Sequence, residues 1–343
     1  MEYIDFNAEQ LRLIGNLEMQ YDATLSVARS LRQLPYHLKW HQSSGKEYLY
    51  QIRNARGDGT SLGPRSAKTD AIKNEYAANK RELKQRLQQT RDALNGTAVF
   101  WRPARLPAIS VEAAKILVEL DIRKMLGDSY LVVGTNAFAA YEIEAGGRFL
   151  LGWDATEDFD LAWTGTLVLG NSGVPATLFS VLKEMDSTWT INTERTFQAR
   201  NAKSYEVELL SAPSVSASLP KGEISPIPLM EQEWLLKGKK LERVICSLST
   251  KPIAARIVAP DPRWMALHKM WLSRQAKRKS DKRPKDARQG ALLLVAVAER
   301  MPGWPIDIAF EAEIPSELKP IYAEWKKDPL GFKPLGATSK PVR

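Results

Sequence analysis

The chain contains one cysteine, Cys246, and three histidines among its 343 residues. A single thiol excludes a disulfide within the chain, and these few ligands exclude a zinc cluster built from cysteine and histidine. We expect Cys246, which ends an apolar run, to be a small buried side chain. No apolar run approaches the roughly 20 residues that span a bilayer, and the first ten residues are too polar for a signal peptide. We therefore expect a cytoplasmic protein without membrane segments.

Positive charge is concentrated in two parts of the sequence, which has a net charge of +9. Residues 51–105 contain twelve Lys or Arg against five Asp or Glu, and residues 269–288 contain nine against two. Either block alone is compatible with a solvated charged face. Two blocks together indicate a surface that attracts a polyanion, such as a nucleotide or RNA.

A short apolar run, Leu131–Val133, ends at the pair Gly134–Thr135, and the helix-compatible stretch Ala137–Tyr141 follows it. This pattern predicts a strand, a turn and a helix, with backbone N–H groups at the turn facing a phosphate. Asp158 and Asp160 lie about two dozen residues further on, in a second apolar segment. Residues two apart on a strand point to the same side. The pair therefore offers two hard oxygen ligands suited to Mg²⁺.

A site with two metal ions needs more than two carboxylates, and Glu206 and Glu208 supply candidates on a third strand-like run. Each element alone is common as an ordinary turn or a solvated strand edge. Their order, within about 80 residues, resembles the DNA polymerase beta-like nucleotidyltransferase superfamily: a Gly-Ser/Thr turn, then Asp-x-Asp, then one acidic residue on a later strand. Both glutamates face one side of their strand, and only the resemblance favours Glu208 over Glu206.

The stretches 156–160 and 207–210 look most like a bacterial branch of uncharacterised nucleotidyltransferase-fold proteins. In that branch the third carboxylate is usually Asp, so Glu208 departs from the pattern. The resemblance implies that Asp158, Asp160 and Glu208 are catalytic and bind metal. It also implies that Gly134 and Thr135 hold the β- and γ-phosphates of a nucleotide.

A second group of residues lies in the C-terminal basic block. Lys269, Arg274, Lys285 and Asp286 are similar in placement to nucleotide-binding elements of abortive-infection-type toxin nucleotidyltransferases, although Gln289 occupies a position where an acid is common. The resemblance implies a nucleotide site in which the two lysines neutralise a triphosphate. A basic, solvated helix pair is the structural alternative.

Several other side chains have both a structural and a functional interpretation. His268 is a possible general base because its ordinary pKa lies near neutrality, whereas packing is the commoner role. Trp264 and Trp271 are core residues by default, with base stacking as the alternative. Arg65 either is exposed beside a Gly-Pro turn or contacts phosphate through its forked guanidinium.

The element pattern predicts an α/β (α+β) fold with a nucleotidyltransferase core and a mixed sheet. We expect an N-terminal helical region with a β-hairpin wing over residues 1–100, and the core over residues 101–226. A proline-rich linker then leads to a mainly helical domain over residues 227–328, followed by a flexible tail over residues 329–343.

Together these features predict a Mg²⁺-dependent enzyme, with two ions and with Mn²⁺ as a substitute, that transfers NMP from an NTP to an acceptor. RNA, such as tRNA, or a protein side chain would serve as acceptor. The toxin-like signature raises a role in growth inhibition or phage defence, with an antitoxin as partner. A catalytically silent nucleotide- or nucleic-acid-binding protein is the alternative.

Overall fold

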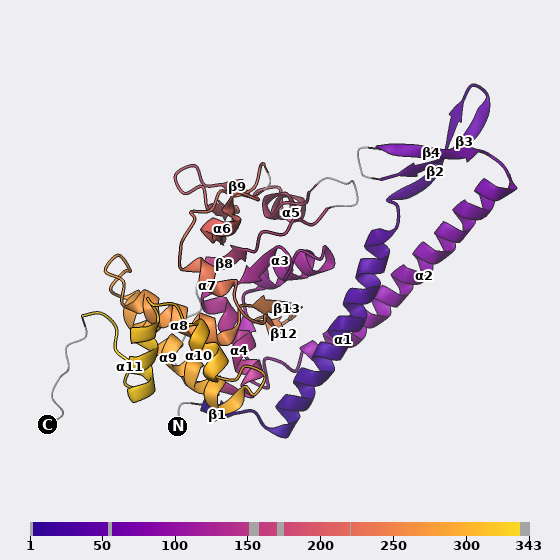
Figure 1. Cartoon of the computed structure of the whole chain (residues 1–343). Helices are drawn as coiled ribbons and strands as arrows, with labels where there is room; N and C mark the ends of the chain where they lie inside the picture. Colours follow the sequence, from indigo (N-terminus) through magenta and orange to yellow (C-terminus); the bar gives the residue numbers. More distant parts are fainter. Residues whose placement is uncertain (1–2, 54–56, 151–157, 170–174, 220, 337–343) are drawn as a thin grey trace.

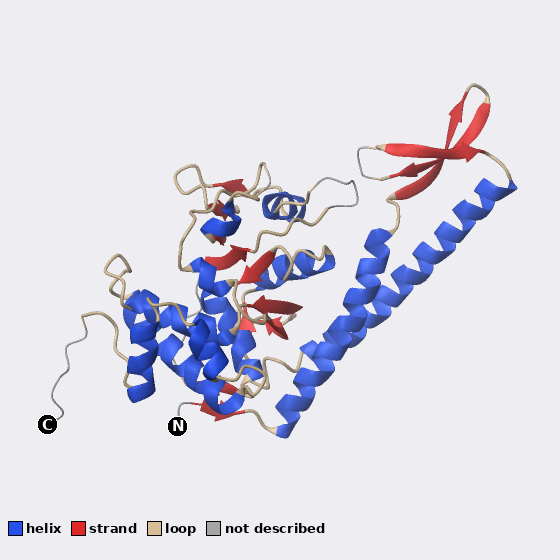
Figure 2. Ribbon diagram, viewed as in Figure 1, coloured by secondary structure: helices blue, strands red, loops and turns tan. Residues whose placement is uncertain are grey.

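The computed structural model describes residues 3–53, 57–150, 158–169, 175–219 and 221–336. It is a mixed α/β structure in which a long helical hairpin extends away from a compact core, and further helices gather at the C-terminal end (Figure 1). The strands lie in the core and at the tip of the hairpin (Figure 2). The predicted fold class, with helical elements at both ends of a mixed core, is confirmed.

The N-terminal arm consists of helices α1 (Ala8–Gln33) and α2 (Ala67–Ala98), which pack side by side. Between them, strands β2 (His37–Ser43), β3 (Lys46–Ile52) and β4 (Gly59–Pro64) form an antiparallel sheet in the order β2-β3-β4. We call this sheet the wing. It lies at the far tip of the arm (Figure 1), and α2 alone is ~48 Å long at 1.5 Å per residue. The structure confirms the predicted hairpin wing and adds a third strand.

Both arm helices begin at capping boxes. The side chain of Asn7 accepts a hydrogen bond from the backbone N–H of Gln10, and the side chain of Gln10 accepts one from the backbone N–H of Asn7. Ser66 and Thr69 form the same reciprocal pair at the start of α2. Such caps satisfy N–H groups that have no partner within the helix. The second of these caps explains why α2 begins at Ala67.

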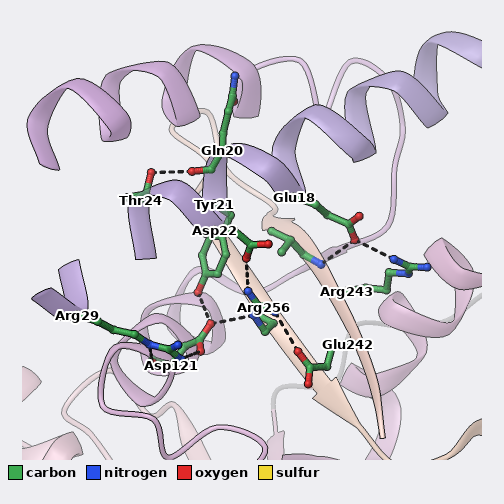
Figure 3. Close-up of polar contacts among 11 residues, drawn as sticks. Glu18, Gln20, Tyr21, Asp22, Thr24, Arg29, Asp121, Glu242, Arg243 and Arg256 are labelled. Atoms are coloured by element: carbon green, nitrogen blue, oxygen red, sulfur yellow. Dashed lines mark hydrogen bonds and ion pairs between the residues drawn. The ribbon is translucent and has the colours of Figure 1, made fainter. Parts of the chain in front are cut away.

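A buried polar network joins the arm to the core (Figure 3). The carboxylate of Asp121 accepts hydrogen bonds from the Tyr21 hydroxyl at 2.9 Å, from Arg29 at 2.8 Å and from Arg256 at 3.1 Å. Burial raises the pKa of Tyr21 well above its ordinary value, and the Asp121 carboxylate adds to that shift. Because a buried charge that loses its partners is costly, this network fixes where α1 rests on the core.

The central sheet has five strands in the order β6-β8-β11-β10-β9. Its members are β6 (Tyr130–Val132), β8 (Asp158–Trp163), β11 (Glu206–Ser211), β10 (Gln198–Arg200) and β9 (Thr190–Ile191). Strands β8 and β11 pair in parallel, and the other neighbours are antiparallel. The sheet is therefore mixed, as predicted.

A second sheet departs from the expected helical character of residues 227–328. Strands β12 (Leu241–Ser247) and β13 (Ala254–Ala259) form an antiparallel pair, and β5 (Ala108–Ile109) joins β12 in parallel. Helices α3 (Val111–Ile122) and α4 (Phe138–Glu144) pack on this sheet. Strands covered in this way become nearly continuous apolar runs, which sequence periodicity cannot separate from a buried helix. The pairing with β5 also crosses the boundary predicted near residue 226.

The remaining elements are short. Strand β1 pairs with β7 in antiparallel fashion beside the start of α1. A 3-10 turn, η1, connects β6 to α4, and the small helices α5, α6 and α7 follow later in the chain. Their bounds are β1 Tyr3–Asp5, β7 Gly147–Phe149, η1 Gly134–Ala137, α5 Leu178–Met185, α6 Pro213–Ser216 and α7 Gln232–Leu235.

The C-terminal helices are α8 (Pro262–Ser273), α9 (Lys282–Arg300), α10 (Ile308–Glu313) and α11 (Lys319–Lys327). Helices α8 and α9 approach so closely that a β-carbon on Gly290 would collide with the backbone and side chains of α8. Within the described ranges, no helix has both the length and the apolar character needed to cross a membrane.

Part of the predicted flexible tail is packed against these helices. Phe332 is buried, and the backbone N–H of Leu335 donates to the carbonyl of Ser273 at 3.1 Å. One buried aromatic side chain and one backbone hydrogen bond therefore hold part of the segment that its proline-rich composition predicted to be flexible. The last seven positions, 337–343, lie outside the described residues.

Candidate active site

Four carboxylates share one face of two neighbouring strands. In the parallel pairing of β8 with β11, Asp158 lies opposite Glu206 and Asp160 lies opposite Glu208. All four are half-buried, while the alternating residue Phe159 and its partner on β11 are fully buried on the other face. Neighbouring strands are ~4.8 Å apart, so the acids form a compact two-by-two group.

The glycine turn lies directly against this group. The backbone N–H of Val133 donates to the carbonyl of Asp160 at 3.1 Å, and the Asn136 side chain donates to the carbonyl of Asp158 at 3.1 Å. Gly134 has φ +66°, and a β-carbon there would overlap the Asp160 carboxylate. The strand, turn and helix predicted around Gly134–Thr135 are present, and this turn closes one side of the carboxylate group.

Burial, together with the neighbouring carboxylates, raises the pKa of Asp160 to about 7. Burial is the largest cause, and the negative charges of Glu208 and Asp158 add to it, whereas Lys269 and Lys282 act in the opposite direction. A carboxylate that is desolvated beside others of the same charge binds its proton more tightly. The positive charge near Asp160 is thus too small to offset burial and the neighbouring acids.

The donor set fits a divalent cation. Asp158, Asp160 and Glu208 offer hard carboxylate oxygens, the ligand type that Mg²⁺ takes in proteins. A bound cation would also reverse the electrostatic cost that the raised pKa of Asp160 reflects. Among the described residues, no three acidic, histidine or cysteine side chains already converge on one metal position. Binding would therefore require the carboxylates to turn toward a shared ion.

Gln198, on β10, holds the third carboxylate and was missed from sequence. Its side-chain nitrogen donates to Glu208 at 2.6 Å and to Glu206 at 3.3 Å, and its oxygen accepts from Asn192 at 3.2 Å. Glu206 also lies 3.7 Å from Arg200. Glu206 is thus partly neutralised, whereas Glu208 acts directly on the charge of Asp160. The choice of Glu208 over Glu206 as the third metal ligand stays a prediction.

A buried ion pair from the C-terminal helices lies near the acids. Lys269, on α8, donates to Asp286, on α9, at 2.9 Å, and Arg278 donates to the other oxygen at 2.7 Å. Burial alone would raise the pKa of Asp286, but the two cations outweigh it and hold that pKa below its usual range. Because Lys269 also lowers the pKa of Asp160, this ion pair lies close enough for its charge to act on the carboxylate group.

The other members of the C-terminal group are placed differently. Arg274 pairs with Glu324 at 2.5 Å and lies 4.7 Å above the ring of Phe332, so its contacts face the end of the chain. Lys285 is half-buried at the start of α9, next to Asp286. Lys282 is exposed and lies one turn earlier. Its charge lowers the pKa of Asp160, and the residue was not selected from the sequence. Its spacing of three from Lys285 was the available signal.

The structure favours the structural interpretation of His268 and Trp264. His268 is buried, and burial together with Lys269 lowers its pKa to about 3, which makes it a weak base at neutral pH. Trp264 is fully buried in the core. Trp271 is half-buried and meets Trp234 edge to face, with ring centroids 5.2 Å apart.

Arg65 forms ion pairs, and Cys246 is part of the core. Arg65 lies in the wing, where its guanidinium pairs with Glu47 at 2.6 Å and with Asp70 at 3.4 Å. Cys246 is fully buried in β12, as expected for a small apolar residue, and burial raises its thiol pKa to about 12.

Comparison with known proteins places this geometry in a family. The search found no matching curated protein and no matching solved structure. A family model described as nucleotidyltransferase matches residues 111–313, more than half of the chain, from α3 into α10. The matched region contains the glycine turn, all four acids and the Lys269–Asp286 pair. The chain therefore belongs to this nucleotidyltransferase family.

Proposed function

We propose that the protein is a Mg²⁺-dependent enzyme that transfers NMP from an NTP to an acceptor hydroxyl. The observation that carries the proposal is the carboxylate group itself: Asp158 and Asp160 share a face with Glu208 on the neighbouring parallel strand, beside the turn at Gly134. Membership of the nucleotidyltransferase family supports the general reaction.

In the proposed reaction, the acceptor oxygen forms a bond to the α-phosphorus while the bond to the β-phosphate oxygen breaks, and pyrophosphate leaves. Asp158, Asp160 and Glu208 would hold two Mg²⁺ ions, with Mn²⁺ as a substitute. Bound cations of this kind neutralise the phosphates and make the attacking oxygen more nucleophilic. Glu208, oriented by Gln198, would take the proton of the acceptor hydroxyl.

The surrounding residues would position the nucleotide. Gly134 and Thr135 lie where the turn meets the carboxylates, so their backbone N–H groups would contact the β- and γ-phosphates. Lys282 and Lys285 would add positive charge for the triphosphate. Lys269 is engaged with Asp286, so its role would be to hold α8 and α9 together while compensating the negative charge at Asp160.

The acceptor we favour is RNA, with tRNA as a candidate, because positive charge is concentrated in the arm as well as beside the acids. A protein side chain is the alternative acceptor. The similarity of the C-terminal elements to toxin nucleotidyltransferases motivates a role in growth inhibition or phage defence, with an antitoxin as partner. These roles, and a cytoplasmic location, are part of the proposal.

The test is incubation of the purified chain with each α-labelled NTP, Mg²⁺, and total cellular RNA or total protein. We expect label to appear in one acceptor class, and to disappear when metal is chelated. The variant Asp160→Asn should give no labelled product while its circular dichroism spectrum stays unchanged. NTP binding without transfer to either acceptor class would instead identify a catalytically silent nucleotide-binding protein.

A further inference from the structure

The two faces of the wing differ in what covers them. Trp40 lies opposite Leu49 in the pairing of β2 with β3, so both side chains are on one face. Leu49 is fully buried, and the cations of Arg65 and of Lys73 on α2 lie 5.1 Å and 5.4 Å from the centre of the Trp40 ring. This inner face is therefore turned toward α2.

The outer face carries aromatic and basic side chains. Side chains alternate along a strand, and the register places Lys39 opposite Tyr50 and His41 opposite Tyr48. Lys39 and His41 are exposed, both tyrosines are half-exposed, and the His41 ring lies 5.4 Å from the Tyr50 ring. By the same alternation, the strand positions on this outer face are His37, Lys39, His41, Ser43, Lys46, Tyr48, Tyr50, the buried Ile52, Gly59, Ser61 and Pro64.

None of these strand positions is acidic. The acid of β3, Glu47, alternates onto the inner face, where it pairs with Arg65. Among the described residues, the strand positions of the outer face thus combine lysines with partly exposed aromatic rings and include no acid. Tyr36, immediately before β2, extends the aromatic surface, with 48% of its area exposed and its ring edge-on to His37 at 4.6 Å.

We propose that the outer face of the wing binds an unpaired strand of nucleic acid. Bases would stack on Tyr48 and Tyr50, while Lys39 and Lys46 would contact the phosphates. Side chains two residues apart on a strand are ~6.6 Å apart, close to the roughly 7 Å that two van der Waals contacts to a planar base require. An acidic protein partner would use the lysines but has no need for the exposed rings.

The position of the wing restricts the size of the ligand. The wing lies at the tip of the arm, away from strands β8 and β11 of the central sheet (Figure 1). A single molecule that touches both the wing and the carboxylates must therefore be an extended polymer. Identifying the bound strand as the acceptor rests on the proposed function, whereas binding to the wing does not.

The test measures binding of the full-length chain to a fluorescein-labelled, unstructured RNA of about 12 nucleotides, within the usual site sizes of such surfaces. We expect the double variant Tyr48→Ala/Tyr50→Ala to weaken binding at least about fivefold, because the bases would lose their stacking contacts with the tyrosine rings. Tyr48→Phe/Tyr50→Phe should retain binding. The charge reversal Lys39→Glu should also weaken binding and reduce its salt dependence, whereas Lys277→Ala, in the other basic block, should have a smaller effect.

Separate readouts keep the two proposals distinguishable. Asp160→Asn should abolish transfer and leave RNA affinity unchanged, so absence of transfer leaves the wing proposal testable. Should the double alanine variant fail to fold, the Lys39→Glu and phenylalanine variants still decide the outcome. Unchanged RNA affinity in Lys39→Glu, tighter binding of duplex than of single strand, or tighter binding of polyglutamate than of RNA would each overturn the proposal.

Discussion

Gly134 and Asp160 are in direct contact, and the carboxylate of Asp160 occupies the space that a β-carbon at position 134 would take. Gly134 also has φ +66°, a conformation that other residues adopt only with strain. The glycine therefore serves two purposes at once: it lets the chain turn after β6, and it lets the turn approach the carboxylate group.

Replacing Gly134 by alanine should lower transfer at least about a hundredfold, because a displacement of about 1 Å at a reacting group has that effect. Gly146→Ala is the matched control. Gly146 has the same φ of +66°, and a β-carbon there would meet nothing within 4 Å. Both variants should lose about 1–2 kcal/mol of stability to backbone strain. Similar transfer rates in the two variants would show that the contact with Asp160 has no catalytic role.

Gln198 should affect activity although it is not one of the proposed metal ligands. In Gln198→Leu, Glu208 loses its 2.6 Å hydrogen bond, and we expect about a 10- to 100-fold loss of activity together with a higher Mg²⁺ requirement, as for residues that orient metal ligands. Kinetics over a range of Mg²⁺ concentrations measures both effects. Asn192→Ala removes the partner on the far side of Gln198 and should have a much smaller effect. An unchanged Mg²⁺ requirement in Gln198→Leu would argue against this orienting role.

Lys269 and Lys282 should differ in what they stabilise. Lys269→Met removes the cation 2.9 Å from the buried Asp286 carboxylate, where Arg278 remains at 2.7 Å, and breaking a buried pair commonly costs about 3–5 kcal/mol. Lys282→Ala should preserve stability and weaken NTP binding, because Lys282 is exposed and acts on the carboxylate group through its charge. Thermal unfolding and NTP titration separate the two effects. Lys277→Ala is the control for general charge loss, and equal loss of NTP affinity there would favour diffuse electrostatics over a formed site.

The sequence predicted those parts of the site that depend on local patterns. Asp158 and Asp160 are two residues apart, so any strand places them on one face, and the apolar run before Gly134–Thr135 indicates a strand that ends in a turn. The wing was predictable for the same reason, since alternation and glycine-containing turns are local signals.

The missed residues depend on which distant segments pair. Gln198 reaches Glu208 because β10 and β11 are antiparallel with these two residues opposite each other, and no local pattern specifies that register. Strands β12 and β13 were missed because helices cover their sheet, which removes the alternation that marks a strand. Phe332 illustrates the same limit at the C-terminus, where a single buried ring holds a segment of loop-like composition.

Glu142 should make the protein less stable as pH rises through neutrality. This buried carboxyl accepts a 2.8 Å hydrogen bond from the backbone N–H of Phe149, yet burial raises its pKa to about 7. The unfolded chain has a glutamate pKa of about 4.3, so the folded state holds the proton more tightly. The stability from this proton is complete below about pH 4.3 and is lost as pH rises through about 7, at a cost of about 4 kcal/mol at most.

The variant Glu142→Gln keeps an acceptor for Phe149 and removes the titrating proton. Denaturant unfolding from about pH 6 to about pH 8.5 should therefore show a smaller loss of stability in Glu142→Gln than in the unaltered chain. At the alkaline end the variant should be the more stable of the two. Glu75→Gln, at an exposed position on α2, should follow the unaltered chain throughout. Asp160, with a pKa that is also about 7, and the buried His268 titrate in both proteins, so the comparison cancels their effects. Parallel stability curves for Glu142→Gln and the unaltered chain would mean that Glu142 is already ionised in the folded state at neutral pH.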